Sequence, residues 1–403
     1  MRWLLAGLLA GCMLVGCGAA VVGTPAVAGA PVPATLLSVV ERSPAEAAAG
    51  VRGAMVELSW ARIEPAPGRV DTAALRAFAA DVAALRRDGR TVSLGLGLHE
   101  TPEWVLALPD ARLVDESGTD SPYASLVFDQ RLRELAEDYL AQVARVVDLG
   151  SFATVRLGAG GLGEVLYPDG GGWWAFDRNA QNGPDLPPSM PRNPAPGWVP
   201  GSGGLSEDGV RAWADWYVGA LVDVVRWQMA TLSRLGFGGS FEVLTPGVGV
   251  VPSAYASAVD RGLPRGQLGT GAAWATVYAG LGRDRRVVAS VTSVADGSGD
   301  NDTCTPDDAG VALSDPTVSS WSATRWITRV AAANGLAVTG ENPGFGSSPE
   351  LDAAYRDESD DGMAAVAWRQ ARSCGLRTLS WAHGRQLWDG TLPLAAFAGR
   401  ARG

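Results

Sequence analysis

Residues 53–99 open with the apolar run GAMVELSW (53–60), continue through TAALRAFAADVAALRRDG (72–89) and end with TVSLGLGLH (91–99). The first and last runs have the length of strands and are rich in apolar residues, which is typical of strands buried on both faces of a parallel sheet. The middle run repeats apolar residues at helical spacing and stops at a glycine, as many helices do. This order of strand, helix and strand is the building unit of parallel α/β folds.

The same alternation continues along the chain. Six further runs have the length of strands: LLSVV (36–40), ATVRLG (153–158), FEVLTPG (241–247), VVASVTSV (287–294), LAVTGE (336–341) and RTLSWAH (377–383). Helical periodicity marks residues 130–150, 207–236, 321–335 and 362–375. Eight strands in this pattern predict an α/β fold, a single (β/α)8 TIM barrel over residues 35–403 with a long loop insertion after the fourth strand.

An open, doubly wound sheet is the alternative architecture. It needs a glycine-rich phosphate-binding turn after an early strand. The run LGAGGLGE (157–164) comes near that spacing, but it ends in a glutamate and enters a loop rich in Pro and Gly. The sequence therefore favours the barrel.

The N-terminus has the pattern of an export signal. A short basic start precedes LLAGLLAGCMLVG (4–16), which is too short to span a membrane comfortably. Leu14-Val15-Gly16-Cys17 resembles a bacterial lipobox, Leu9-Ala10-Gly11-Cys12 offers a second one, and cleavage near residue 28 is the alternative. We expect a signal peptide over residues 1–17, lipidation of Cys17 and a flexible tether over 18–34. The protein would then be exported and anchored at the bacterial cell surface, or otherwise secreted.

The composition excludes several classes of protein. All 33 basic residues are arginine, so Schiff-base, pyridoxal phosphate and P-loop lysine chemistry is excluded. Only two histidines occur, and no zinc-binding spacing is present. A net charge of -10 and a pI near 4.9 argue against nucleic acid as a partner. We expect no cofactor and no metal.

Two further cysteines, Cys304 and Cys374, remain after the N-terminal segment. In an oxidising compartment they would form one disulfide, and two buried free thiols are the alternative. Cys304 lies in the acidic run ADGSGDNDTCTPDD (295–308), whose carboxylates either bind calcium or form a solvated loop.

Two glutamates follow predicted strands at positions where barrel enzymes carry their chemistry. Glu164 follows the fourth strand and Glu341 ends the seventh. Active sites of this fold lie at the carboxyl ends of the strands, so the two side chains should converge. Hydrolysis of a glycosidic bond needs such a pair, because one carboxyl donates a proton while the other, ionised, attacks the sugar or activates water.

Aromatic and polar residues gather after the same strands. With 15 tryptophans the chain is rich in indole, which stacks on sugar faces. The alternative is that these indoles fill the core and that the long loop 166–204 is clamped by its own aromatics. The residues expected to bind substrate are Trp60, Arg62, His99, Trp104, Tyr167, Trp173, Trp174, Asn342, Trp381, His383 and Trp388.

Two short motifs resemble glycoside hydrolases. WARIEPAPG (60–68), followed by His99, Pro102 and Trp104, resembles the W-x-R-x-E-P-x-x-G region of clan A enzymes and of the family 42 beta-galactosidase group. That resemblance implies a barrel with Glu164 as acid/base and Glu341 as nucleophile. GGLGEVLYP (160–168) is similar instead to the G-x-x-G-E-x-x-Y-P stretch around the acid of beta-amylases, which invert configuration. Gly163 also replaces the asparagine usual in clan A, so retention and inversion both stay open.

The sequence thus predicts an enzyme, a glycoside hydrolase acting on a neutral oligo- or polysaccharide without a cofactor. A carbohydrate-binding lipoprotein on a barrel that has lost catalysis is the alternative. An amidase or esterase is disfavoured because the chain lacks a G-x-S-x-G nucleophile elbow.

Overall fold

The structure is a computed structural model that describes residues 37–39, 46, 49–282, 284–299, 303–346 and 348–400. Cys17, the signal peptide and the tether predicted for residues 1–34 lie outside the described residues. Within the described part of the chain, none of the helices has both the length and the apolar character needed to cross a bilayer.

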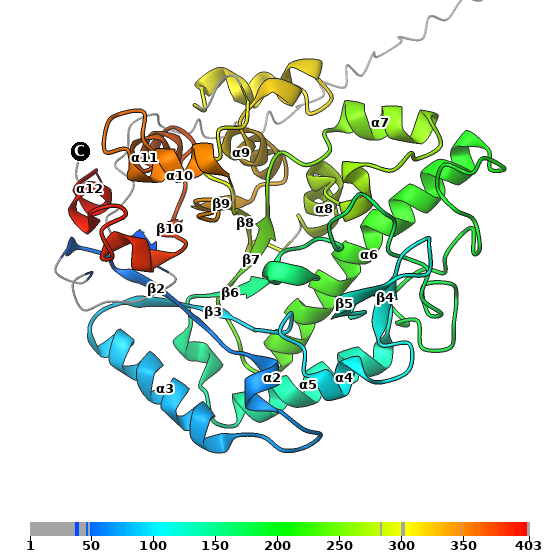
Figure 1. The fold of residues 1–403 in the computed structure, drawn as a ribbon, viewed down its shortest axis with the longest axis horizontal. Coiled ribbons are helices and arrows are strands. Elements are labelled where there is room, and N and C mark those ends of the chain that lie inside the picture. The colour runs from blue at the N-terminus through cyan, green and yellow to red at the C-terminus, as the bar shows by residue number, and fades with distance from the viewer. Residues whose placement is uncertain are drawn as a thin grey trace, which may run out of the picture.

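Eight parallel strands form the central sheet, and each corresponds to one predicted strand (Figure 1). Their order around the sheet is β1, β10, β9, β8, β7, β6, β3 and β2. The two end strands, β1 and β2, lie beside each other with Cα atoms within 8 Å, so the sheet curves into a nearly closed barrel. The strands are β1 (Leu37–Val39), β2 (Gly53–Glu57), β3 (Thr91–Gly95), β6 (Thr154–Leu157), β7 (Ser240–Thr245), β8 (Val287–Val291), β9 (Ala337–Glu341) and β10 (Leu379–Trp381).

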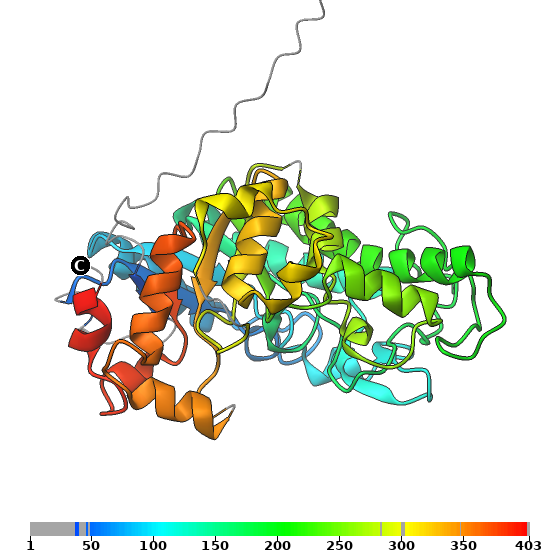
Figure 2. The same ribbon diagram turned by 90° about the horizontal axis from the view of Figure 1, so that it is seen from above.

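Helices follow the strands and cover the outside of the barrel (Figures 1 and 2). The longer ones match the predicted periodic segments, and all of these except α11 begin at a side-chain cap; for example, the Asp71 carboxylate accepts a hydrogen bond from the Ala74 amide. They are α3 (Thr72–Arg87), α5 (Gln130–Ala144), α6 (Glu207–Arg234), α9 (Ala323–Ala333) and α11 (Met363–Ser373). Shorter helices, which the sequence did not predict, are α2 (Trp60–Ile63), α4 (Glu103–Leu106), α7 (Pro252–Asp260), α8 (Trp274–Leu281), α10 (Pro349–Arg356) and α12 (Leu394–Gly399).

The barrel wall is buried on both faces. All five residues of β8 are buried, as are five of the six in β7. This explains the nearly continuous apolar runs, since the inner face packs inside the barrel and the outer face packs under helices. Each of the eight predicted strands overlaps one strand of the barrel.

Two irregular insertions extend the barrel at one end. An antiparallel hairpin of β4 (Arg112–Val114) and β5 (Asp120–Ala124), which the sequence did not predict, lies between β3 and α5. The long loop after β6 runs from Glu164 to the cap of α6 at Ser206 without helix or strand, and the structure describes every residue of it. Figure 2 shows this end of the molecule opposite α11 and α12.

Candidate active site

Glu164 is presented by a tight turn at the end of β6. The 3-10 turn Gly161–Gly163 follows the strand, and the Glu164 carbonyl accepts hydrogen bonds from the amides of Ala159 and Gly160. A Cβ on Gly158 would lie 2.0 Å from the Gly163 carbonyl oxygen, so only glycine fits there. The amide of the next residue, Val165, donates to Leu244 at the end of β7 and fixes the turn to the barrel.

Glu341 ends β9, and its side chain opens into the same pocket as Glu164. This pocket measures about 710 Å3 including the space at its mouth. It lies among the carboxyl ends of β2, β3, β6, β7, β8 and β9, where this fold places active sites. The structure therefore brings the two predicted glutamates together at one cavity, which His99 also lines.

Glu164 is in a poorly hydrated environment without an ion-pair partner in the described residues. Burial raises its pKa to about 7, and the neighbouring charge of Glu341 acts in the same direction. The Thr292 hydroxyl donates to Oε1 of Glu164 at 2.5 Å, and this hydrogen bond, together with the more distant Arg156, opposes the rise. A substantial fraction of Glu164 is therefore protonated near neutral pH.

Glu341, in contrast to Glu164, has an ion-pair partner. Nη2 of Arg156 lies 2.5 Å from its Oε2, and both side chains are largely buried, at 13% and 14% exposure. A guanidinium at this distance stabilises the ionised carboxylate. The two carboxyls that share the pocket thus differ in the charge state that their neighbours favour.

Three charged residues of the barrel interior were missed at the sequence level. Glu57, Arg156 and Glu242 lie at one register across the sheet, with Gly95 between the first two. Burial raises the pKa of Glu57 and of Glu242, while Arg156 lowers both. The available signal was a charged residue inside each apolar strand, in GAMVE, TVRL and SFEVLT.

The side chains of Glu57, His99 and Glu100 come close enough to share a ligand. One donor atom from each lies within 4.8 Å of the others, a spacing that a metal ion could use. The Glu57 side chain is 39% exposed at the mouth of the barrel, Glu100 is exposed, and the His99 Nε2 to Glu57 Oε1 distance is 3.9 Å. His99 packs beside Gly163, whose added Cβ would lie 3.4 Å from the imidazole.

Most of the expected sugar-stacking residues lie in the core rather than at the pocket, so they offer no face to a ligand. Trp173 packs edge-on against Trp213 and Tyr217 of α6, and these contacts hold the long loop against that helix. For these side chains the alternative interpretation, a loop clamped by its own aromatics, fits the structure. The buried residues of the predicted set are Trp60, Tyr167, Trp173, Trp174 and Trp381, and Trp104 is half-buried with its indole N–H on the Glu64 carbonyl.

The remaining predicted contacts also lie outside the pocket lining. Arg62 is exposed on α2, and His383 and Trp388 are exposed around the 3-10 turn Gly384–Leu387. Asn342 is buried and structural: its Oδ1 accepts from the Ala382 amide at 2.9 Å, which ties the end of β9 to the end of β10. The aromatic ring that does line the pocket is Tyr123 of the hairpin, packed on Gly161.

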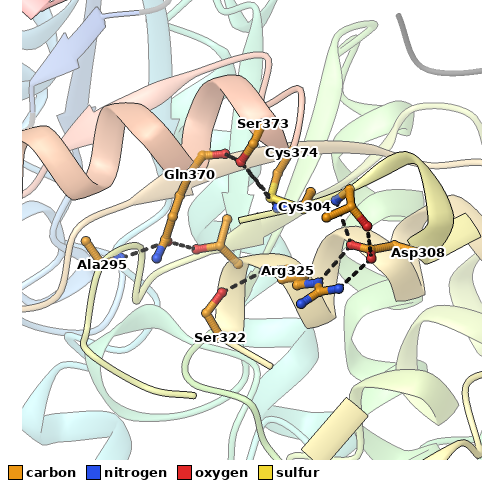
Figure 3. Close-up of a disulfide and its surroundings, with 10 residues drawn as sticks. Ala295, Cys304, Asp308, Ser322, Arg325, Gln370, Ser373 and Cys374 are labelled. Carbon is orange, nitrogen blue, oxygen red and sulfur yellow. Dashed lines mark hydrogen bonds and ion pairs between the residues drawn. A yellow bond between two sulfur atoms is a disulfide. The ribbon is translucent and has the colours of Figure 1, made fainter. Parts of the chain in front are cut away.

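The acidic loop is tied to the barrel by a disulfide and an ion pair (Figure 3). Cys304 and Cys374 are bonded, as predicted, across 70 residues. Asp308 forms a bidentate pair with Arg325 of α9, at 2.6 and 2.9 Å, so this carboxylate has a protein partner. Asp300 and Asp302 lie outside the described residues.

Comparison with known proteins identifies structural relatives. No family model and no curated sequence matches the chain. The structure is similar to the catalytic domain of a beta-amylase from Paenibacillus polymyxa, at TM-score 0.56 and 14% identity over 91% of this chain and 96% of that one. It also resembles beta-galactosidases from Marinomonas ef1 (TM-score 0.54, 15% identity, 86% of this chain) and Halorubrum lacusprofundi (TM-score 0.54, 16% identity, 91% of this chain).

These alignments span 53% and 57% of the two beta-galactosidases, and nearly all of the beta-amylase domain. At such low identity the likeness concerns the fold and not the activity. The chain has the (β/α)8 barrel fold that these enzymes share.

Proposed function

We propose that the protein is a glycoside hydrolase that cleaves O-glycosidic bonds in a neutral oligo- or polysaccharide. The observation that carries this proposal is the pair Glu164 and Glu341 on one pocket, the first with its pKa raised to about 7 and the second ion-paired to Arg156. Glycoside hydrolysis requires two carboxyls in different charge states. The shared fold of beta-amylase and beta-galactosidases supports the same class of reaction.

In this mechanism the protonated Glu164 donates its proton to the glycosidic oxygen as the bond to the anomeric carbon breaks. The ionised Glu341 either attacks that carbon, forming a glycosyl ester that water then hydrolyses, or removes a proton from an attacking water. The first route retains the anomeric configuration and the second inverts it. The sequence motifs support both routes, through the family 42 and the beta-amylase resemblances respectively.

The test is hydrolysis of a panel of plant, fungal and bacterial glycans and aryl glycosides by wild type, Glu164→Gln and Glu341→Gln. Glu207→Gln, at the exposed start of α6, is the matched control. We expect turnover by wild type and control, and losses of several orders of magnitude in both active-site variants. Proton NMR of the first-formed anomer then distinguishes retention from inversion. Saturable glycan binding without turnover would instead identify a carbohydrate-binding protein.

We also propose export and lipid anchoring through Cys17. The lipobox-like residues support this, and the disulfide between Cys304 and Cys374 is of the kind that persists in oxidising compartments. Metabolic labelling of expressing bacteria with a palmitate analogue should mark the wild type and leave Cys17→Ala unlabelled. Equal labelling of both would contradict the assignment of this cysteine.

A further inference from the structure

We propose that Arg156 is a positioning residue for Glu341, orienting this carboxylate and keeping it ionised from inside the barrel, with the buried Glu242 at ion-pair distance from the same guanidinium. The inference rests on the proposed function and concerns a residue to which the sequence analysis gave no role. Arg156 acts through Glu341 and not on the sugar.

The geometry places one guanidinium near two carboxylates, on β7 and β9, which are separated in the sheet by β8. Arg156 of β6 pairs in register with Glu242 of β7, so both side chains leave the same face of the sheet. Nη2 of Arg156 lies 2.5 Å from Oε2 of Glu341, and its Nε lies 4.0 Å from Oε2 of Glu242. The guanidinium thus hydrogen-bonds to Glu341, whereas its Nε has no hydrogen-bond partner in the described residues and is only at ion-pair distance from Glu242.

The ion pair matters because the three side chains of this arrangement are largely buried. The side chains of Arg156, Glu242 and Glu341 are 13%, 10% and 14% exposed. In the described part of the chain, Arg156 is the cation within ion-pair distance of either carboxylate. A buried carboxylate whose partner is removed becomes protonated or moves. The ionised form of Glu341 that the mechanism requires therefore depends on this one arginine.

Other titratable groups also surround Glu341. Its carboxylate faces like charges at Glu164 after β6, at Glu242 on β7 and at Glu57 on β2. Tyr355 of α10 also lies within range of its charge. Arg156 is electrostatically coupled to Glu57, Glu242 and Glu341, and all three favour its charged form. Removing Arg156 and removing Glu242 should therefore change the ionisation of Glu341 in different ways.

The experiment compares pH profiles of kcat/KM on an aryl glycoside for wild type, Arg156→Met, Arg156→Lys and Glu242→Gln. Arg76→Met, exposed on α3, is the control. We expect Arg156→Met to lose about a hundredfold to a thousandfold in kcat/KM, as for a broken buried ion pair. The acidic limb of the pH profile of Arg156→Met should move to higher pH by at least about one unit. Arg156→Lys should retain more activity and an acidic limb nearer to that of wild type.

Two readouts separate this role from simple damage to the fold. Added guanidinium ions should restore part of the activity of Arg156→Met, because Arg156 lines the pocket. Glu242→Gln should not move the acidic limb to higher pH, since it removes the negative charge of Glu242 and leaves Arg156 in place. The proposal would be overturned if the acidic limb of Arg156→Met did not shift and guanidinium did not restore activity. It would also be overturned if the acidic limbs of Arg156→Met and Glu242→Gln moved to higher pH by similar amounts. Glu341→Gln tests the proposed function separately: if it retains turnover, that function fails regardless of the arginine.

Discussion

Glu341 is the last residue of β9 and Glu164 follows the turn after β6, so both lie at the carboxyl end of the barrel, yet their nearest neighbours differ. A hydroxyl, from Thr292, contacts the first, and a guanidinium, from Arg156, contacts the second. Burial raises the pKa of Glu164, and the Thr292 hydrogen bond only partly opposes this rise, whereas Glu341 is paired with a guanidinium. The two roles that the proposed mechanism needs therefore follow from burial at Glu164 and from a single arginine of β6 at Glu341.

The raised pKa of Glu164 predicts how activity falls in alkaline solution. Since Glu164 must be protonated to act as the acid, kcat/KM should decline as pH rises through about 7. Thr292→Val removes a hydrogen bond that favours the ionised form, so the pKa and the basic limb should move upward by about one pH unit. Thr292→Ser keeps the hydroxyl and should leave the limb in place. A downward shift in Thr292→Val would contradict the assignment.

At this scale the sequence predicted the two glutamates but not their partners. Glu164 and Glu341 could be found because they follow apolar runs at strand ends, where the fold places function. Arg156 and Glu242 lie within such runs, and whether a strand residue faces the barrel interior depends on a register that one sequence does not reveal. The sequence also could not distinguish buried tryptophans such as Trp173 from indoles at the pocket, since an indole suits a core as well as a sugar site.

The turn after β6 is the element on which the proposed role of Glu164 depends. Gly158→Ala would place a Cβ against the Gly163 carbonyl, and this backbone atom cannot move without displacing Glu164. We expect kcat/KM to fall by about a hundredfold, as for a displacement of about 1 Å at a catalytic group. Gly219→Ala is the control, since its added Cβ meets nothing within 4 Å inside α6 and should stabilise the protein by about 0.5–1 kcal/mol. Equal activity in both variants would argue against the role of this turn.

The disulfide between Cys304 and Cys374 ties the loop after β8 to the end of α11 (Figure 3). Because it closes a segment of 70 residues, the chain-entropy argument gives a contribution of about 4 kcal/mol to the free energy of unfolding. The double variant Cys304→Ser, Cys374→Ser should therefore unfold at markedly lower urea concentration than wild type. A reductant should lower the midpoint of the wild type and leave that of the double variant unchanged. No effect of reductant on the wild type would contradict the prediction.

Elements were predictable where their pattern was long or repeated. The helices α3, α5 and α6 have regular apolar spacing and side-chain caps, and a glycine follows α3 and α6, so several local signals agree. The hairpin β4–β5 was missed because its strands are short and polar, with Asp120 and Pro122 in the second. Tyr123, which this hairpin brings to the pocket, was missed with it.

At the scale of the whole molecule, the barrel brings together residues that lie far apart in the sequence. The residues that meet at the pocket extend from Glu57 to Glu341 and come from the ends of several strands. The repeated alternation of strand and helix made this architecture predictable, because parallel strands must all end at one face of the barrel. What the alternation cannot predict is the shape of the cleft, which depends on insertions such as the hairpin and the loop after β6.

The central claim, that Glu164 is the acid and Glu341 its ionised partner, is tested most directly by varying the leaving group. The kcat/KM values for an aryl glycoside with a poor leaving group and for its dinitrophenyl counterpart should be compared for wild type, Glu164→Gln and Glu341→Gln, because kcat/KM reports the step in which the leaving group departs. A good leaving group departs without protonation, so Glu164→Gln should lose kcat/KM strongly on the first substrate and far less on the second. Glu341→Gln should lose turnover on both. Equal losses of Glu164→Gln on the two substrates, or near-normal turnover by Glu341→Gln, would contradict the assignment.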